Sequence, residues 1–302
     1  MVTKPAFMPP AHIALIGLGN MGVPMGACLV RAGYSVTGYD AAVSARQRFS
    51  AAGGAVVETL AASVANAELA ITVLPNGKVV REVVQAMRAH LRPGSVIVDM
   101  SSSDPVGTRA LGEEMLRAGF EFADAPVSGG VRRAVDGSLA IMVGGDAATL
   151  DRVQPVLAAM GRAIFRTGAL GSGHAIKALN NYVSAAGLVA AVEAIAIGRR
   201  FGLDPALMAD IFNASSGRNN TTEAKLKQFI LSETFDAGFP LRLMAKDVRT
   251  ADDLARAVGV PAPLADAVAN IWDAAARDLP EAADHTAVGR YLANLPAKIA
   301  KA

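Results

Sequence analysis

The chain has 302 residues, of which 52% are hydrophobic and 19% charged, which suits about two folded domains and excludes a disordered protein. Its 29 basic and 27 acidic side chains give a net charge of +2, so we expect no nucleic-acid partner and no anionic membrane partner. The single cysteine, Cys28, excludes an intrachain disulfide, and the four separated histidines give no metal-ligand spacing, so we expect no metal.

Neither the stretch before Ala11 nor the most apolar run of the chain predicts a membrane segment. The residues before Ala11 include three prolines and no apolar stretch of the kind that a signal peptide needs. The most apolar run, residues 185–198, is interrupted by Glu193 and is shorter than a bilayer requires. We therefore expect a cytoplasmic protein.

The first half of the sequence alternates short β-branched runs with helical patterns. The runs typical of strands cover residues 12–16, 35–39, 69–73, 96–99, 120–123, 141–143 and, more weakly, 164–166. The helical patterns cover residues 21–32, 44–52, 78–89, 105–118 and 147–160. Such alternation predicts a mostly parallel sheet covered by helices on both faces.

After about Gly168 the strand pattern stops. Helical patterns follow at residues 174–201, 204–213, 222–231, 244–258, 262–278 and 287–295, with Pro296 ending the last. We predict an α/β domain over residues 1–168 and an all-α domain over residues 169–302, joined by the long helix that begins at His174.

A glycine-rich turn follows the first predicted strand and opens the first predicted helix. It reads Gly17-Leu18-Gly19-Asn20-Met21-Gly22 and fits the G-x-G-x-x-G pattern. In this context the first glycine permits a tight turn, the second lets the backbone approach a pyrophosphate, and the third lets helix and strand pack closely. The pattern predicts a Rossmann-type dinucleotide-binding domain.

The second predicted strand ends at Asp40, about 20 residues beyond the first glycine. A carboxylate there can accept hydrogen bonds from the ribose hydroxyls of the adenosine and would repel a 2′-phosphate. Ala41, which follows, is not basic, so the sequence favours NAD as the cofactor. Arg46 and Arg48, further along a predicted helix, leave NADP open.

Two polar segments follow other predicted strands. Ser128-Gly129-Gly130 exposes a hydroxyl and backbone N–H groups together, which suits a substrate carboxylate, although an ordinary turn accounts for these residues equally well. Residues 101–103 are all serine and lie where ligands bind in open α/β sheets, or they simply cap the next helix.

The long helix carries a polar stripe on an otherwise apolar surface. His174, Lys177, Asn181 and Ser184 are three or four residues apart and so share one face. Lys177 near the start of the helix could simply extend toward solvent. A partly desolvated lysine, however, is a good general acid or base near neutral pH, and Asn181 could orient it.

These residues resemble a known family, the β-hydroxyacid dehydrogenases, whose members include 3-hydroxyisobutyrate dehydrogenase and several semialdehyde reductases. The resemblance covers nearly the whole chain and rests on six motifs in order: G-L-G-N-M-G at 17–22, D-M-S-S-S-D-P at 99–105, D-A-P-V-S-G-G at 124–130, G-S-G-H-A-I-K-A-L-N-N at 171–181, N-A-S-S-G-R at 213–218 and L-M-A-K-D at 243–247.

The resemblance implies roles for individual residues. The cofactor would be held by Gly17, Leu18, Gly19, Asn20, Met21, Gly22, Asp40, Leu74, Pro75, Ser102 and Lys246. The substrate would be held by Ser128, Gly129, Gly130, Ser102, Phe239 and Asp247, with Lys177 as catalytic acid/base and Asn181 as its partner. Val79 departs from the pattern, because some members carry an asparagine there that contacts the cofactor.

The resemblance thus implies an NAD-dependent oxidoreductase that interconverts a small 3-hydroxy acid, such as 3-hydroxyisobutyrate, and its semialdehyde. An NADPH-linked reductase of tartronate or succinic semialdehyde or of glyoxylate is the main alternative. An imine reductase or an inactive dinucleotide-binding module is less favoured, because those relatives generally lack the lysine. The apolar long helix and the resemblance both predict a homodimer or homotetramer.

Overall fold

The computed structural model describes residues 4–295, so Pro296 lies outside the described part of the chain. The chain divides into two compact units, with the boundary between Lys177 and Ala178. Unit 1, which ends at Lys177, therefore includes the first turn of the long helix, a segment that the sequence had assigned to the second domain.

Unit 1 is built on a nine-stranded sheet in the order β3-β2-β1-β4-β5-β6-β8-β7, with β9 beside β8. The strands are β1 His12–Ile16, β2 Ser35–Tyr39, β3 Ala55–Val56, β4 Leu69–Thr72, β5 Val96–Asp99, β6 Glu121–Asp124, β7 Val127–Ser128, β8 Leu139–Gly144 and β9 Gly161–Gly168. Neighbours from β3 to β6 pair in parallel, whereas β8 pairs antiparallel with β6 and β7. This confirms the predicted α/β sheet.

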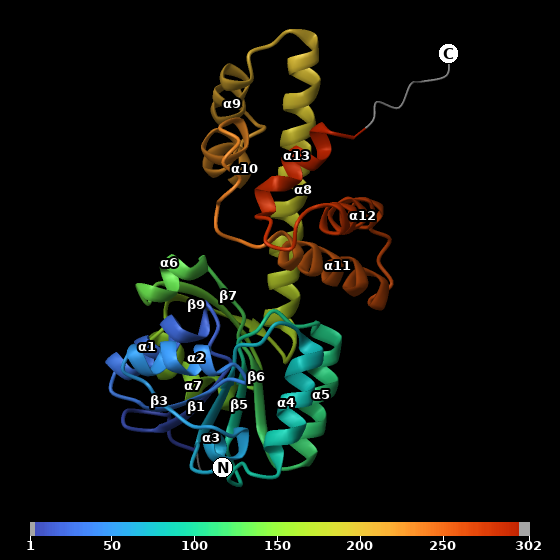
Figure 1. Ribbon diagram of the computed structural model, residues 1–302. Coiled ribbons are helices and arrows are strands. Elements are labelled where there is room, and N and C mark those ends of the chain that lie inside the picture. Colours follow the sequence, from blue (N-terminus) through green and yellow to red (C-terminus); the bar gives the residue numbers. More distant parts are fainter. Residues whose placement is uncertain (1–3, 296–302) are drawn as a thin grey trace. The chain divides into compact units, whose positions relative to one another are not determined.

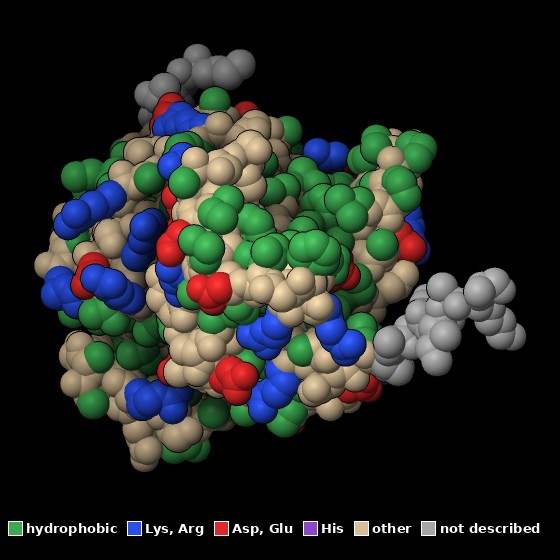
Figure 2. Space-filling model, turned by 90° about the horizontal axis from the view of Figure 1, so that it is seen from above, with side chains coloured by type: hydrophobic (Ala, Val, Ile, Leu, Met, Phe, Trp, Pro, Cys, Tyr) green, Lys and Arg blue, Asp and Glu red, His purple; other side chains and the backbone are tan. Residues whose placement is uncertain are grey.

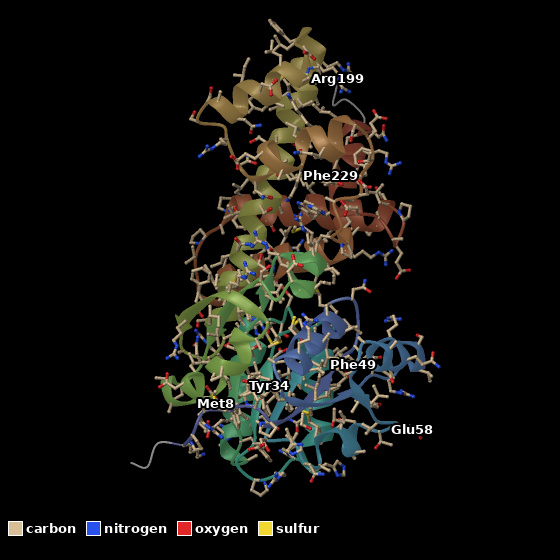
Figure 3. The ribbon with its side chains drawn as sticks, turned by 90° about the vertical axis from the view of Figure 1, so that its left-hand side faces the viewer. Met8, Tyr34, Phe49, Glu58, Arg199 and Phe229 are labelled. Atoms are coloured by element: carbon tan, nitrogen blue, oxygen red, sulfur yellow. The ribbon has the colours of Figure 1, made fainter. Side chains whose placement is uncertain are left out.

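Helices cover both faces of this sheet (Figure 1). They are α1 Gly22–Arg31, α2 Val43–Ala51, α3 Leu60–Val64, α4 Gly77–Arg88, α5 Pro105–Arg117, α6 Gly130–Val135 and α7 Ala147–Ala158. Alternate residues of β1 point to opposite faces, so Leu15 joins one apolar core and Ile16 the other. In the first core the Phe49 ring, labelled in Figure 3, packs against three positions that lack a side chain, Gly26, Gly38 and Gly54.

The start of several helices is fixed by a side chain that accepts a backbone N–H. Asn76 caps α4, Asp104 caps α5 and Asp146 caps α7, each through its side-chain oxygen. The first two caps follow β4 and β5, so they fix where each loop at the carboxyl edge of the sheet ends and its helix begins. Cys28 on α1 is buried, and burial raises the pKa of its thiol.

Unit 2 is helical and packs around Trp272, which is fully buried. Its elements are the remainder of α8 Ser172–Phe201, α9 Pro205–Ala214, α10 Asn220–Ala224, the π-helical η1 Leu226–Leu231, α11 Leu241–Ala257, α12 Pro263–Asp278, the 3₁₀ turn η2 His285–Ala287 and α13 Val288–Ala293. The single helix predicted over residues 222–231 is wrong, because Lys225 leaves helical geometry (φ −132°) and separates α10 from η1.

Helix α8 exposes large apolar side chains in unit 2, including Val183, Ile197 and Phe201, with 68%, 71% and 83% of their surface accessible. Figure 2 likewise shows hydrophobic side chains gathered on one face among Lys, Arg, Asp and Glu. Helix α8 is long and apolar enough to cross a membrane, but this is judged by length and hydropathy alone. Core helices of water-soluble proteins meet the same two criteria. The expected homo-oligomer would cover such side chains and stays a prediction.

Candidate active site

The glycine-rich turn after β1 is closed at its two ends and open in the middle. Gly17 has a positive φ (+99°), and a Cβ there would lie 2.2 Å from the carbonyl oxygen of Val73. A Cβ on Gly22 would lie 1.9 Å from the carbonyl oxygen of Gly17. Gly19, in contrast, is exposed and would meet nothing within 4 Å. The turn therefore leaves room for a pyrophosphate beside the start of α1, so these residues fit a dinucleotide.

Asp40, directly after β2, is fixed by the same turn. Its Oδ2 accepts the N–H of Leu18 and its Oδ1 accepts the N–H of Ala42, both at 2.8 Å. Each carboxylate oxygen can still accept a further hydrogen bond, as a ribose diol would require. The Arg46 guanidinium donates to the carbonyl oxygen of Asp40 at 2.6 Å, so it is engaged with the backbone.

The loops after β1 and β4 meet where the strand order reverses, the usual ligand position in a doubly wound sheet. Leu74, just after β4, donates its N–H to Ser101 Oγ (2.9 Å), while Pro75 is exposed. Ser102 is half-buried and follows Ser101 directly. The structure thus brings the predicted cofactor residues Leu74 and Ser102 onto two hydrogen-bonded loops at one edge of the sheet.

A buried polar cluster lies beside these loops. Asp99, at the end of β5, accepts hydrogen bonds from the Thr72 and Ser103 hydroxyls at 2.9 and 2.7 Å. The ring of His174 lies against it, with Nε2 3.1 Å from the carbonyl oxygen of Ser101 and 3.7 Å from Asp99 Oδ2. Nε2 therefore carries a hydrogen, since a carbonyl oxygen only accepts. Neither Asp99 nor His174 is more than 1% exposed.

Asp124, at the end of β6, holds the first turn of α8. Its two oxygens accept the N–H groups of Gly171 and His174, each at 2.7 Å. The other ring nitrogen of His174 lies 2.9 Å from Thr108 Oγ1 on α5. Burial raises the pKa of the Asp124 carboxyl, because it outweighs the favourable contacts with His174. Lys177, one turn further along α8, is only 9% exposed, so most of its surface is removed from water.

Sequence reasoning included Asp124 and His174 in motifs but assigned neither the task of holding α8. The signal was present: both are ionisable residues in otherwise apolar or small-residue segments. The sequence alone did not show that these two residues, 50 positions apart, are joined by a hydrogen bond in the fold.

The segment Ser128-Gly129-Gly130 lies between β7 and α6. Gly129 and Gly130 both have positive φ (+128° and +66°), a conformation that suits glycine. Ser128 is half-buried and both glycines are exposed, so the segment faces solvent within unit 1. Its predicted role in binding a carboxylate stays a prediction.

In unit 2, Asn181 is oriented by Asp247. The Asn181 amide donates to Asp247 Oδ2 at 2.6 Å, and Lys246 forms an ion pair with Asp247 Oδ1 at 3.0 Å. Asn181 and Asp247 are 6% and 2% exposed. The structure therefore joins three predicted site residues in one hydrogen-bonded group, in which Asp247 fixes the amide of Asn181.

Phe239 is held by Asp284, a residue that no sequence motif singled out. Asp284 Oδ2 accepts the N–H groups of Gly238 and Phe239 at 2.8 and 2.9 Å, and the Phe239 ring meets His285 edge-on at 5.8 Å. Burial would raise the pKa of the Asp284 carboxyl, but hydrogen bonds from His285 and Thr286 outweigh it and hold that pKa far below its usual range.

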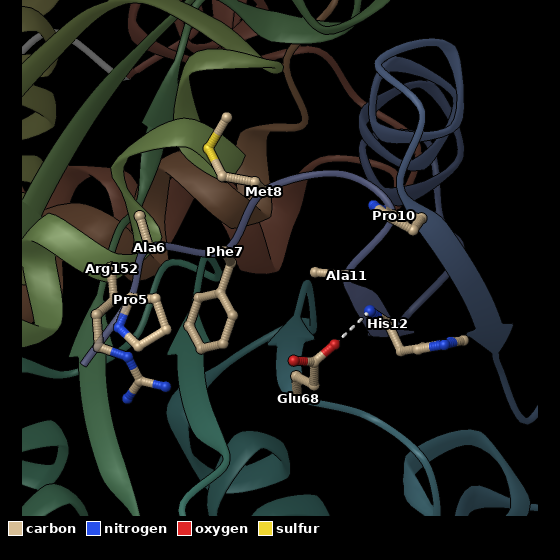
Figure 4. A pocket seen from close by; sticks show the side chains of 9 residues that line it. All are labelled: Pro5, Ala6, Phe7, Met8, Pro10, Ala11, His12, Glu68 and Arg152. Atoms are coloured by element: carbon tan, nitrogen blue, oxygen red, sulfur yellow. Dashed lines mark hydrogen bonds between the residues drawn. The ribbon is translucent and has the colours of Figure 1, made fainter.

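A separate hollow of about 380 Å³ lies at the opposite end of β1, between Phe7, His12, Glu68 and Arg152 (Figure 4). The His12 N–H donates to Glu68 there at 3.0 Å, and the Arg152 guanidinium stacks on the Phe7 ring. Because β1 begins at His12, this hollow lies at the amino edge of the sheet. It is therefore not part of the candidate active site, whose unit 1 residues lie at the carboxyl edge.

Comparison with known proteins finds relatives that match both units of the chain. Residues 12–168 match the model of the NAD-binding domain of 6-phosphogluconate dehydrogenase, and residues 171–292 match that of the NAD-binding domain of NADP-dependent 3-hydroxyisobutyrate dehydrogenase. A solved structure of Mycobacterium tuberculosis 3-hydroxyisobutyrate dehydrogenase with L-serine is similar, with 36% identity, a TM-score of 0.89 and coverage of 95% of this chain and 99% of that one.

Two further relatives differ in their named substrates. The 2-(hydroxymethyl)glutarate dehydrogenase of Eubacterium barkeri is 35% identical, and the match covers 86% of this chain and 88% of the relative. The NAD-dependent L-serine dehydrogenase of Pseudomonas aeruginosa is 34% identical, with coverage of 84% and 88%.

The glycine turn, the carboxylate at the end of β2 and the doubly wound sheet define a dinucleotide-binding oxidoreductase. Together with these matches over both units, they show that the chain belongs to the β-hydroxyacid dehydrogenase family. It is an NAD(P)-dependent dehydrogenase of hydroxy acids, as the sequence predicted, and the family includes NADP-dependent members.

Proposed function

We propose that this enzyme uses NAD to oxidise a small 3-hydroxy acid of the 3-hydroxyisobutyrate type to its semialdehyde, with Lys177 as the acid/base. The observation that carries the proposal is the burial of Lys177 one turn beyond His174, in the same unit as the glycine turn. Relatives named for 3-hydroxyisobutyrate, serine and 2-(hydroxymethyl)glutarate support the substrate class, since each name describes a carboxylate with a hydroxymethyl group.

In the proposed chemistry the residues of the chain handle the proton and the negative charge. The glycine turn and Asp40 would hold NAD, which would supply the hydride acceptor for the carbon that carries the hydroxyl. The neutral amine of Lys177 removes the hydroxyl proton, and in the reverse direction its ammonium protonates the alkoxide and stabilises the developing charge. Asn181, oriented by Asp247, would place its amide oxygen for a hydrogen bond with the amine or the substrate.

We further propose that NAD is preferred over NADP and that Ser128, Gly129 and Gly130 bind the substrate carboxylate. The Asp40 carboxylate supports the cofactor preference, because it is fixed at the end of β2 and would repel a 2′-phosphate. The exposed hydroxyl and glycine backbone of residues 128–130 support the carboxylate site.

The test is Lys177→Met, which keeps an unbranched side chain and removes the amine. We expect turnover of 3-hydroxyisobutyrate to fall by about 100-fold or more, because a positioned general base contributes about 10²–10⁴-fold. Binding of NADH, followed by its fluorescence, should be unchanged. Lys227→Met, at an exposed position paired with Asp210, is the matched control and should keep full activity. Wild-type turnover by Lys177→Met would remove this residue from the mechanism.

A further inference from the structure

The short helix α6 places an arginine over the Ser128-Gly129-Gly130 segment. A Cβ built on Gly129 would meet the Cβ, Cγ and Cδ of Arg133 at 2.8, 3.1 and 2.4 Å. The aliphatic part of Arg133 therefore lies directly across Gly129, in the space that a side chain there would occupy. Because side chains of a helix lean toward its amino end, an arginine one turn into α6 reaches back over the residues that precede it.

The guanidinium of Arg133 forms no ion pair within the described residues 4–295. None of the ion pairs or side-chain hydrogen bonds in that part of the chain includes its nitrogens. Arginine side chains lose considerable rotamer freedom when they are packed, so the contact with Gly129 restricts where the charge can go. The guanidinium begins one bond beyond the Cδ that lies against Gly129, so it is close to this segment and available to an anion.

The direction of Arg133 separates it from the dinucleotide turn. Val131 and Val135 of α6 line a hollow together with Gly19 and Asn20, so this face of α6 is the one toward the pyrophosphate position. At roughly 100° per residue, Arg133 lies about 160–200° around the helix from these two valines. Arg133 therefore points away from the cofactor turn and toward the other side of residues 128–130.

We propose that Arg133 binds a second anionic group of the substrate, so that the enzyme prefers 3-hydroxy acids that carry two carboxylates. This inference rests on the proposed function, in which Ser128, Gly129 and Gly130 bind the first carboxylate. A hydroxyl and two N–H groups already offer three donors to the four lone-pair sites of one carboxylate. A guanidinium fork beside them exceeds what one carboxylate accepts and suits a second one bound in a bidentate manner.

The experiment compares two substrates with Arg133→Met, whose unbranched side chain keeps the contact with Gly129. One substrate is 3-hydroxyisobutyrate, and the other is 2-(hydroxymethyl)succinate, the same molecule with a carboxylate on its methyl carbon. The wild type should have the higher kcat/KM for the dicarboxylate. Arg133→Met should lower that value by about 10- to 100-fold, as expected for a charged hydrogen bond, and change 3-hydroxyisobutyrate turnover by less than about twofold.

Arg132→Met is the matched control, because Arg132 is the adjacent exposed arginine of the same helix. Arg132→Met should leave kcat/KM for both substrates unchanged. Arg133→Lys should retain part of the preference for the dicarboxylate, because it keeps a positive charge. An equal loss with both substrates, or a raised KM for NAD, would overturn the proposal, since Arg133 would then serve the shared carboxylate or the cofactor. The proposal would also be overturned if the wild-type enzyme oxidised 3-hydroxyisobutyrate but showed no preference for the dicarboxylate. The proposed function would then remain intact.

Discussion

The two units use the same device to hold a predicted site segment, but its electrostatics are opposite. In unit 1, Asp124 accepts two backbone N–H groups at the start of α8; in unit 2, Asp284 accepts two from Gly238 and Phe239. Burial raises the pKa of Asp124, whereas the hydrogen bonds of Asp284 outweigh burial and lower its pKa. A carboxylate anchor is therefore acid-sensitive only where hydrogen bonds outweigh its burial.

Breaking the unit 1 anchor should have the largest effect. In Asp124→Asn, an amide N–H₂ group replaces one of the two carboxylate oxygens that accept the N–H groups of Gly171 and His174. One of these buried N–H groups therefore loses its acceptor. We expect the folded state to lose about 2–3 kcal/mol and turnover to fall by about 100-fold, because Lys177 depends on this turn of α8. Thermal melting and steady-state kinetics measure both.

The control for that variant is Asp151→Asn, which removes an exposed carboxylate paired with Arg166 and should change stability by less than about 1 kcal/mol. Full activity in Asp124→Asn would show that Lys177 is positioned by other contacts.

A smaller effect is expected in Asp247→Asn, which weakens the anchor of Asn181 in unit 2. The charged hydrogen bond of 2.6 Å becomes a neutral one, so we expect kcat to fall by about 10-fold. The KM for NAD should change little. Asp253→Asn, on an exposed face of the same helix α11, should behave as the wild type. If both variants are equally active, Asn181 does not need its carboxylate partner.

The smallest effect, and one that depends on pH, is expected in Asp284→Asn. Since the folded pKa of Asp284 is depressed, its ionised form stabilises the fold above its unfolded pKa, near 3.8, and this contribution is lost as pH falls further. We expect the variant to be less stable by about 1–2 kcal/mol at pH 7, and we expect this difference in stability to narrow progressively as the pH falls below about 3.8.

Melting curves at several pH values measure how this difference in stability changes. For Asp124 the pH dependence of the contribution to stability has the opposite sign. Its folded pKa is raised, so its contribution to stability falls as pH rises above its unfolded value. A constant difference between Asp284→Asn and the wild type across this range would contradict the assigned ionisation.

The sequence predicted those parts of the fold that repeat or are long. The central strands of unit 1 and the helices α8, α9, α11 and α12 show a clear period in their hydrophobic residues. The glycine turn also predicts the strand before it and the helix after it. The elements β3, α3, β7 and α6 were missed because two to six residues are too few to show a period. The π-helical break at Lys225 was missed because nothing in the local pattern separates it from an ordinary helix.

For the site, the order of the motifs identified the candidate residues but not the residues whose hydrogen bonds hold them in place. Lys177, Asn181 and Asp247 were selected from the sequence, whereas Asp284 was not, since an aspartate before a short turn is common. The hydrogen bonds of Asp124 and Asp284 join residues about 45–50 positions apart, and such meetings are decided by packing. Arg133 was likewise missed, because its contact with Gly129 depends on α6 forming.

The burial of Cys28 makes this enzyme convenient for spectroscopy. Its thiol, the only one in the chain, is 3% exposed, and a raised pKa disfavours the reactive thiolate. A cysteine introduced at an exposed position, such as Arg132 on α6, would therefore react with a thiol-directed fluorophore far faster than the native one. The natural sequence is in effect already a background for single-site labelling, and a dye beside residues 128–130 would report substrate binding without relying on turnover.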